Sequence, residues 1–251
     1  MRKTYDTIAG QAPHIALAFL NEGYVPLDPA ESEPVLTDED RPFQYNVNLY
    51  HHVACQIVLA GKDVLEVGSG RGGGSYYLMR YLGPASVTGL DLSPVNVALA
   101  TRAFAREGLR FQQGDAEALP FPLGSLDVVV NIESSHLYPR PWRFFREAHR
   151  VLRPRGHLLF VDLGDRARME GLGDEFRRAG FEVLMARDIT RNVTESIRLD
   201  NERRAGLLSA MAESEENLKE LSAWARLVGT PGYVAYCEGR DQYWSYVLRK
   251  R

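Results

Sequence analysis

The chain has 251 residues, of which 45% are hydrophobic and 25% charged, the ordinary composition of a soluble globular protein. Its formal net charge of −3 argues against a global positive field that would attract nucleic acid, and it has neither a signal-peptide-like start nor an apolar run approaching the roughly 18 residues of a membrane span. The two cysteines, Cys55 and Cys237, are far apart, so we expect a reducing, cytoplasmic setting and no structural zinc site.

The first 61 residues predict helices around an acidic loop. The stretch "PHIALAFLNEGY" (13–24) has apolar residues at helical spacing, and Gly23 is a suitable stop. The proline-bearing stretch 26–42 lacks periodicity and indicates a surface loop. Helical spacing returns over 43–61 and is expected to end at Gly61.

From Lys62 onward the pattern alternates between short apolar runs and helical segments. Such alternation predicts a parallel sheet with helices on both of its faces. Ser93 is expected to cap the second helix, with Pro94 at its first position. The expected strands are 63–68, 86–93, 109–116, 126–134, 157–163 and 181–190, and the expected helices are 73–83, 94–108 and 142–156.

The alternation stops after the sixth expected strand. Residues 192–228 are predicted to be helical, and "QYWSYVLRK" (242–250) alternates like a final strand. A helical insertion between the last two strands would lie above the carboxyl edge of the sheet, where open α/β folds bind ligands. We therefore expect it to serve as a cap over a substrate, although a simple packing role is the alternative.

The turn "EVGSGRGGG" after the first strand indicates a ligand site. Glycines let the backbone approach a ligand closely, and the helix that follows presents free N–H groups. Gly68, Gly70 and Gly73 match the G-x-G-x-x-G string of dinucleotide sites, so the string alone does not choose the ligand. No G-K-[ST] follows, which argues against an ATP-type phosphate loop.

Two acids that follow the next strands separate these alternatives. Asp91 ends the second strand and can accept both hydroxyls of a ribose, in dinucleotide sites and elsewhere. Asp115 ends the third strand and can receive an adenine amino group, a role that dinucleotide folds do not give this position. With Glu66, these acids recur at the ends of successive strands and would line one crevice.

These motifs, in this order, resemble class I S-adenosylmethionine-dependent methyltransferases. The resemblance covers about 62–163 and rests on "DVLEVGSGRGG", "VTGLDLSP", "FQQGDAEALPFPLGSLDVVVNIES" and "EAHRVLRPRGHLLFVDL". With "YNVNLYHHVA" and "NIESSHLYP" added, the chain is similar to the phthiotriol/phenolphthiotriol dimycocerosate O-methyltransferases and related natural-product enzymes. The resemblance implies an α/β, Rossmann-like fold: a seven-stranded, mostly parallel sheet with a helical cap. It divides the chain into an N-terminal arm and lid (1–61), a cofactor-binding core (62–190), and a cap with the last strand (191–251).

The resemblance implies S-adenosylmethionine as cofactor and S-adenosylhomocysteine as product. Gly68, Ser69 and Gly70 would pass beneath the methionine part, and Glu66 would steady the loop or meet the amino group through water. The other implied cofactor contacts are Asp91 with the ribose, Leu92 with the adenine, Asn96 nearby, Asp115 and Ala116 with the adenine, and the Asn131 carbonyl with the ammonium.

Methyl transfer to a hydroxyl also needs a base near the methyl group. "NIESSHLYP" places Glu133 and His136 just past the fourth strand, and imidazole suits the task. Asp162, at the tip of the fifth strand, could orient His136. A structural histidine and a loop-capping acid are the alternatives. Tyr45, Tyr50, Glu133 and Trp244 are candidate substrate contacts, and no metal site is predicted.

A small-molecule hydroxyl is the expected acceptor, on a lipid, polyketide, sugar or aromatic compound. "NIES" differs from the D/N-P-P-Y string of enzymes that methylate DNA bases, and one glutamate stands where arginine methyltransferases have two. C- or N-methylation, a methyltransferase-like cyclase that keeps its methyl group, and a cofactor-sensing binding module remain open. No nucleic-acid partner is expected, and a homo-oligomer is possible.

Overall fold

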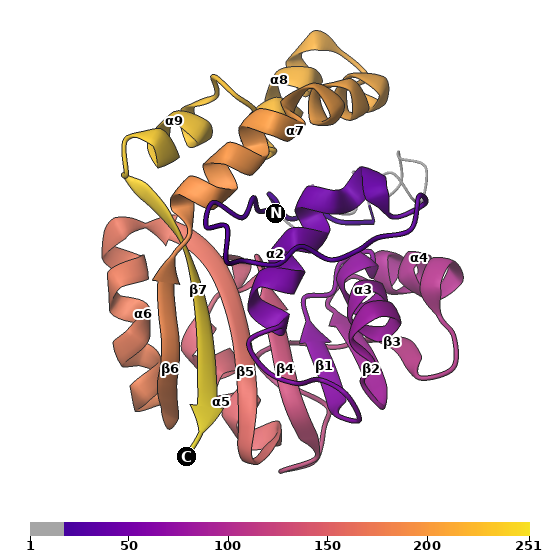
Figure 1. The fold of residues 1–251 in the computed structure, drawn as a ribbon, viewed down its shortest axis with the longest axis vertical. Helices are drawn as coiled ribbons and strands as arrows, with labels where there is room; N and C mark the ends of the chain where they lie inside the picture. The colour runs from indigo at the N-terminus through magenta and orange to yellow at the C-terminus, as the bar shows by residue number, and fades with distance from the viewer. Residues whose placement is uncertain (1–17) are drawn as a thin grey trace.

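One sheet of seven strands organises the part of the chain that a computed structural model describes, residues 18–251 (Figure 1). Its strand order is β3-β2-β1-β4-β5-β7-β6, and only β7 runs antiparallel to its neighbours. The predicted fold class is confirmed. The strands are β1 (Asp63–Val67), β2 (Ser86–Asp91), β3 (Leu109–Gln113), β4 (Leu126–Ile132), β5 (Leu152–Asp165), β6 (Phe181–Asp188) and β7 (Asp241–Lys250).

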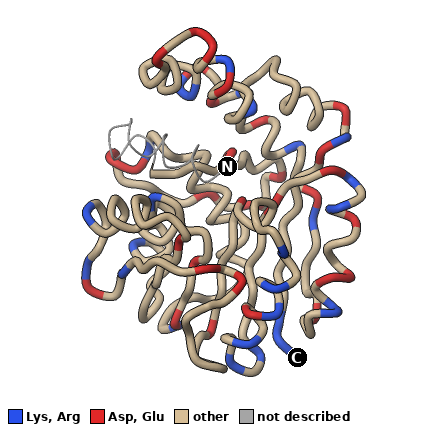
Figure 2. Tube along the Cα trace, turned by 180° about the vertical axis from the view of Figure 1, so that it is seen from behind, with Lys and Arg blue, Asp and Glu red and all other residues tan. Residues whose placement is uncertain are grey.

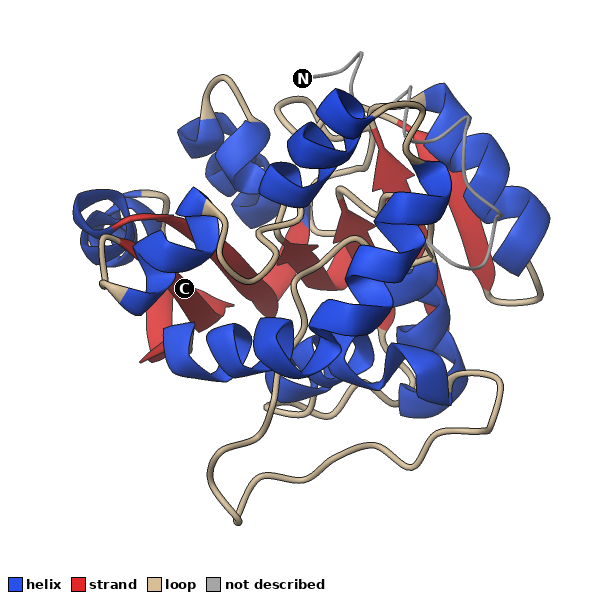
Figure 3. Cartoon of the chain, turned by 90° about the horizontal axis from the view of Figure 1, so that it is seen from above, coloured by secondary structure: helices blue, strands red, loops and turns tan. Residues whose placement is uncertain are grey.

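Helices cover both faces of the sheet, as the view in Figure 3 shows. Local signals set their ends: the Ser93 hydroxyl accepts from the Asn96 N–H at the start of α4, and Gly83 takes the left-handed conformation after α3. The helices are α2 (Gln44–Ala54), α3 (Gly73–Leu82), α4 (Pro94–Phe104), α5 (Pro141–Val151), α6 (Arg166–Arg178), α7 (Thr190–Met211), α8 (Glu215–Trp224) and α9 (Pro231–Cys237), with 3₁₀ turns η1 (Arg41–Phe43) and η2 (Ser135–Leu137).

The central strands are apolar on both faces because two separate cores pack against them. Along β4, Val128 and Val130 belong to the core shared with α2 and α3, whereas Val129 belongs to the core under α5 and α6. Successive side chains of a strand point to opposite faces, so an unbroken apolar run is what a doubly covered strand requires.

Several predicted helix boundaries are wrong. Residues 18–24, the described part of the predicted helix 13–24, are not helical, while residues 13–17 lie outside the described chain. Their backbone groups form hydrogen bonds with distant residues instead of with one another. The Ala18 carbonyl accepts from the Gly73 N–H, and the Tyr24 N–H donates to the Tyr45 carbonyl.

The other differences lie at helix ends. The helix expected over 94–108 ends at Phe104, and the stretch expected to be helical over 192–228 is divided at residues 212–214 into α7 and α8. The helix expected over 43–61 ends at Ala54, well before Gly61, and turns lead from there into β1. The helix expected over 142–156 ends at Val151, because the following residues already belong to β5 and Leu152 pairs with Leu126 of β4.

The acidic stretch 26–42 contains no helix or strand before η1, as predicted for a loop. The helices α7, α8 and α9 follow β6 and precede β7, as expected for an insertion between the last two strands, and lie above the sheet (Figure 1). Figure 2 shows acidic and basic residues interspersed along the chain, consistent with the small net charge. Among the described residues, no helix is both long and apolar enough to cross a membrane.

Close packing explains the glycine that extends the turn after β1. A Cβ at Gly74 would lie 2.1 Å from the Tyr50 ring, which closes over the start of α3. Real Cβ atoms do not approach other atoms so closely, so only glycine leaves the Tyr50 ring in this place. Gly74 therefore fixes how α2 lies against α3.

We expect Gly74→Ala to lower the free energy of unfolding by about 1–3 kcal/mol, because the added methyl displaces the Tyr50 ring. Gly206→Ala is the matched control: Gly206 lies within α7, and nothing lies within 4 Å of a Cβ placed there. That substitution should raise stability by up to about 1 kcal/mol, since glycine is unfavourable inside a helix. Urea unfolding measures both, and equal effects of the two substitutions would contradict the packing explanation.

Candidate active site

A cavity of about 760 Å³ lies at the carboxyl ends of the central strands. Its walls come from the segment 18–22, from the turns that follow β1, β2, β3 and β4, and from residues 223–226 at the end of α8. Its volume is within the usual range for small-molecule sites, and its position is where open α/β sheets bind ligands. Arg204 of α7 and Gly232 of α9 also line it, so the insertion forms part of its wall.

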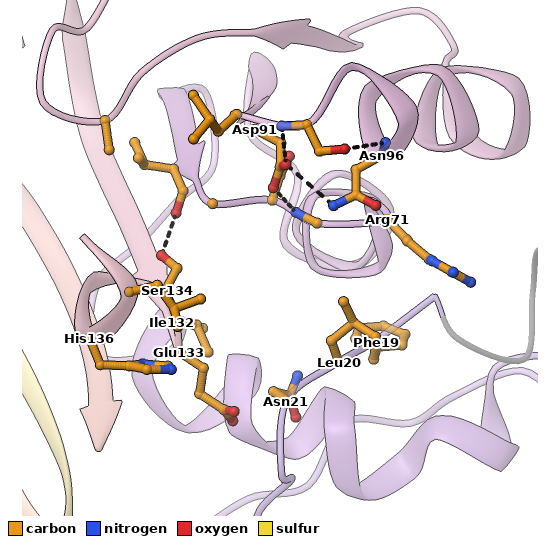
Figure 4. A pocket seen from close by; sticks show the side chains of 18 of the residues that line it. Phe19, Leu20, Asn21, Arg71, Asp91, Asn96, Ile132, Glu133, Ser134 and His136 are labelled. Carbon is orange, nitrogen blue, oxygen red and sulfur yellow. Dashed lines mark hydrogen bonds between the residues drawn. The ribbon is translucent and has the colours of Figure 1, made fainter. Parts of the chain in front are cut away.

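Asp91 ties the glycine turn to the end of β2 (Figure 4). Its Oδ2 accepts from the Gly70 N–H at 2.8 Å, and its Oδ1 accepts from the Ser93 N–H at 2.9 Å and from Asn96 Nδ2 at 3.3 Å. Donors from both neighbouring turns therefore fix the carboxylate at the cavity wall. Gly68 and Ser69 also line the cavity, and their N–H groups both donate to the Leu90 carbonyl.

The next part of the wall comes from the ends of β2 and β3. Leu92 lines the cavity and remains 55% exposed, so it offers an apolar surface to a ligand. Asp115 and Ala116 line it as well, and Asp115 Oδ1 accepts from the Glu117 N–H at 2.8 Å. A carboxylate beside two apolar side chains suits a flat ring that bears an amino group.

Glu66 is buried beneath the glycine turn and does not line the cavity. The Tyr50 hydroxyl donates to its Oε1 at 2.6 Å, and the Ser75 hydroxyl donates to its Oε2. Burial raises the pKa of this carboxyl from its usual 4.5 to about 7, although both hydroxyls favour the charged form. Glu66 thus joins α2, β1 and α3 under the turn.

His136 and Asp162 form a hydrogen-bonded pair at the cavity wall that follows β4. His136 Nδ1 lies 2.7 Å from Asp162 Oδ1, and the carboxylate is fully buried while the imidazole lines the cavity. The Leu163 N–H donates to the same carboxylate oxygen at 2.9 Å, and the Ser135 hydroxyl donates to Oδ2. With Nδ1 held by a carboxylate, Nε2 is the imidazole nitrogen that can accept a proton.

Not every predicted site residue reaches the cavity. Asn131 is fully buried behind the wall, where its Nδ2 donates to the Val67 carbonyl at 2.9 Å; Ile132 and Glu133 line the cavity instead. Tyr50, Glu133 and His136 line the cavity, as expected for substrate or catalytic residues.

Tyr45 and Trp244 are the two predicted substrate contacts that the structure places elsewhere. The Tyr45 carbonyl pairs with the described N-terminal segment. Trp244 stacks on Tyr246 at 5.9 Å and donates from Nε1 to Gln242 Oε1. Alternation along β7 puts Trp244 in the core under α6, so the aromatic run near the C-terminus does not line the acceptor end.

Sequence reasoning predicted a lid and a cap but not the residues with which these two segments line the cavity. Leu20, Asn21 and Glu22 line the cavity from the extended N-terminal segment, and Arg204 and Trp224 line it from the cap. Neither segment carries a motif or a strand end that would reveal these positions.

Within residues 18–251, no group of three or more His, Cys, Asp or Glu side chains is arranged to hold a metal ion. Cys55 and Cys237 are both exposed, free thiols.

The family model described as "Methyltransferase domain" matches residues 65–160. A phthiotriol/phenolphthiotriol dimycocerosates methyltransferase of Mycobacterium leprae is 42% identical over 192 residues, which are 76% of this chain and 70% of that protein. A fatty-acid O-methyltransferase of Mycolicibacterium smegmatis is 48% identical over 146 residues, 58% of this chain and 53% of that one. Among solved structures, the [4+2]-cyclase SpnF has a TM-score of 0.75 at 25% identity, covering 99% of this chain and 94% of its own.

The raised pKa of Glu66 predicts a pH-dependent stability. The unfolded chain releases this proton near pH 4.5, whereas the folded chain keeps it until about pH 7. The Glu66 contribution is therefore present at low pH and is lost as the pH rises through about 7. Relative to the original chain, Glu66→Gln should gain about 2 kcal/mol in free energy of unfolding between about pH 5 and pH 8.

Urea unfolding of the protein without ligand, at several pH values, measures this difference. Tyr50→Phe is a companion variant that removes one hydrogen bond to the carboxylate, so it should move the loss of stability to higher pH. A difference between Glu66→Gln and the original chain that stays constant with pH would show that Glu66 titrates normally.

Proposed function

Because the chain belongs to the S-adenosylmethionine-dependent methyltransferases, in the family of the phthiotriol/phenolphthiotriol dimycocerosates methyltransferases, we propose that it methylates a hydroxyl of a small lipid or secondary metabolite. The observation that supports this most is the His136–Asp162 pair at the cavity wall. A hydroxyl needs a base, and an imidazole held by a buried carboxylate can serve as one.

The cofactor of this enzyme is S-adenosylmethionine, and the cavity wall fits it. We assign the ribose hydroxyls to Asp91, whose carboxylate is fixed at the wall by donors from two turns. The adenine ring would lie against Leu92 and Ala116 with its amino group toward Asp115. The methionine part would cross the turn at Gly68 to Gly70, and Asn96 supports this region through its bond to Asp91.

When bound, the cofactor supplies a methyl group on a sulfonium, whose leaving group is the neutral thioether of S-adenosylhomocysteine. His136 Nε2 takes the proton of the acceptor hydroxyl as the oxygen attacks, so the imidazole becomes charged. Asp162 stabilises that charge through Nδ1 and is itself held by the Leu163 N–H. The other walls exclude water and align the acceptor oxygen with the methyl group.

We assign residues 191–251 to a cap that encloses the acceptor, and residues 1–61 to a lid whose described part closes one side of the cavity. Arg204, Trp224 and Glu22 support this division, since they line the cavity from these two segments. The name of the Mycolicibacterium smegmatis relative specifies O-methylation of a fatty acid. That name favours transfer to oxygen over C- or N-methylation in this chain.

The similarity to a [4+2]-cyclase does not favour a second function. The cyclase is 25% identical to this chain, whereas a relative that is 42% identical is named a methyltransferase. A cyclase would leave the cofactor intact, so stoichiometric release of S-adenosylhomocysteine with an acceptor separates the two activities.

Asp91→Asn should weaken S-adenosylmethionine binding about 10- to 100-fold, because a charged acceptor of two ribose hydrogen bonds is replaced by an amide. Titration calorimetry measures the affinity. Asp127→Asn is a matched control at the opposite end of the sheet, where Asp127 pairs with Arg153, and it should leave the affinity unchanged. Equal affinities for Asp91→Asn and the original chain would refute the assignment of the ribose to Asp91.

His136→Ala should lower kcat about 10²- to 10⁴-fold, because the substitution removes the base. The cofactor affinity should stay the same, because the residues assigned to the cofactor are unchanged. Asp162→Asn should have a smaller effect in the same direction. His157→Ala, at the amino end of β5, is the control and should retain full turnover. Release of S-adenosylhomocysteine from a hydroxyl acceptor is the measurement, and full turnover by His136→Ala would rule out the base.

A further inference from the structure

Glu133 lies next to the proposed base in an unusual conformation. It follows β4, and its φ of 49° is in the left-handed region that residues other than glycine, asparagine and aspartate rarely adopt. Such strain persists where surrounding contacts enforce it and is frequent at functional sites. Figure 4 shows the Glu133 side chain extending from the cavity wall beside His136, on the side where Asn21 lies.

A backbone donor and a nearby hydroxyl hold the Glu133 carboxyl at the cavity wall. Oε1 accepts from the Glu22 N–H at 2.7 Å, and the Tyr243 hydroxyl also faces this carboxyl. Because Glu133 lines the cavity, its carboxyl faces the space of a bound acceptor. Each carboxyl oxygen has two lone pairs, so the group can take a further hydrogen bond from a ligand.

The carboxyl of Glu22 lies behind this position and is itself incompletely paired. Glu22 is only 7% exposed; its Oε1 lies 3.2 Å from Arg226 Nε, and its Oε2 has no hydrogen-bond partner. The hydroxyls of Tyr236 and Tyr243 face Glu22 and Glu133, respectively, without a hydrogen bond of normal geometry. Polar groups therefore surround the two glutamates, both of which line the cavity.

The charges around the two carboxyls favour a neutral ligand. Arg226 pairs with Glu22 and with Asp241, at 3.0 Å, and lies over the Tyr236 ring. Burial, and then the charge of Glu22, raise the pKa of Glu133 well above its usual value, and burial also raises that of Glu22. A carboxyl that holds its proton can donate as well as accept a hydrogen bond.

We propose that Glu133, supported by Glu22, binds a second hydroxyl of the acceptor. The acceptor is then a diol: one hydroxyl faces His136 Nε2, and the adjacent hydroxyl forms a hydrogen bond with Glu133. This inference rests on the proposed function, since it places the methylated hydroxyl at His136. A hydroxyl matches a group that donates and accepts. A carboxylate would be repelled by the two acids, and an ammonium would face Arg226 and Arg204.

The test compares two probes, dodecane-1,2-diol and dodecan-1-ol, which differ by one hydroxyl. Each is titrated into the enzyme loaded with S-adenosylhomocysteine, where no methyl transfer can occur, and the dissociation constant is measured by calorimetry. We expect the diol to bind about tenfold more tightly, as one further hydrogen bond to a carboxyl would give. Equal affinities, weaker binding of the diol, or binding of neither alcohol would overturn the proposal.

Glu133→Gly removes the carboxyl and suits the left-handed backbone, so the variant should fold and bind both alcohols equally, with the affinity for dodecan-1-ol within about threefold of the original. Arg155→Gly is the matched control: Arg155 is exposed and also left-handed (φ 63°), but it lies at the amino end of β5, away from the cavity. It should keep the preference for the diol.

A Glu133→Gly variant that still prefers the diol would refute the role of Glu133. If the variant does not fold, the comparison of probes on the original chain still decides the proposal. The experiment also separates this inference from the proposed function, because binding to the product complex needs no base. Tight binding of the diol without any methyl transfer from S-adenosylmethionine would contradict the proposed function and leave the diol site standing.

Discussion

The reversal of strand order at β1 is the constraint on which the rest of the structure depends. Strands β2 and β3 lie on one side of β1, and β4 and β5 lie on the other, so the connections after β1 and β4 leave on opposite sides and a crevice opens between them. The cavity occupies that crevice. Asp91 at the end of β2 and His136 after β4 therefore stand on opposite walls, one suited to a nucleoside and the other to an acceptor.

Two layers of support make this crevice a defined site. Beneath the glycine turn, Glu66 joins Tyr50 of α2 to Ser75 of α3, and Gly74 leaves space for the Tyr50 ring. Above it, the Gly73 N–H donates to the Ala18 carbonyl and the Glu22 N–H donates to the Glu133 side chain, which attaches the N-terminal segment to both walls. The same segment thus contacts the glycine turn after β1 and the end of the cavity beside His136.

The sheet, and the positions at the strand ends that line the cavity, could be predicted from sequence because their signals are local. Apolar runs, the Ser93 cap and acids at strand ends each identify a position without reference to the rest of the fold. The helix expected over 13–24 failed in its described part because tertiary backbone bonds outweigh local periodicity there. Trp244 was misplaced because alternation in β7 does not tell which face meets the cavity, and Glu22 carries no motif at all. Contacts made by coil and by an insertion depend on distant partners, which one sequence does not reveal.

The account holds that the cofactor's methyl group ends on an oxygen of the acceptor, with His136 removing the proton and Asp162 stabilising the imidazolium. The fate of the methyl group tests this most directly. The enzyme is incubated with S-adenosylmethionine carrying a trideuterated methyl group and with a long-chain alcohol or diol, and the product is identified by mass spectrometry and NMR. A labelled methyl ether, formed together with an equal amount of S-adenosylhomocysteine, is the predicted result. The label on carbon or nitrogen, or an intact cofactor after the acceptor has been converted, would contradict the account.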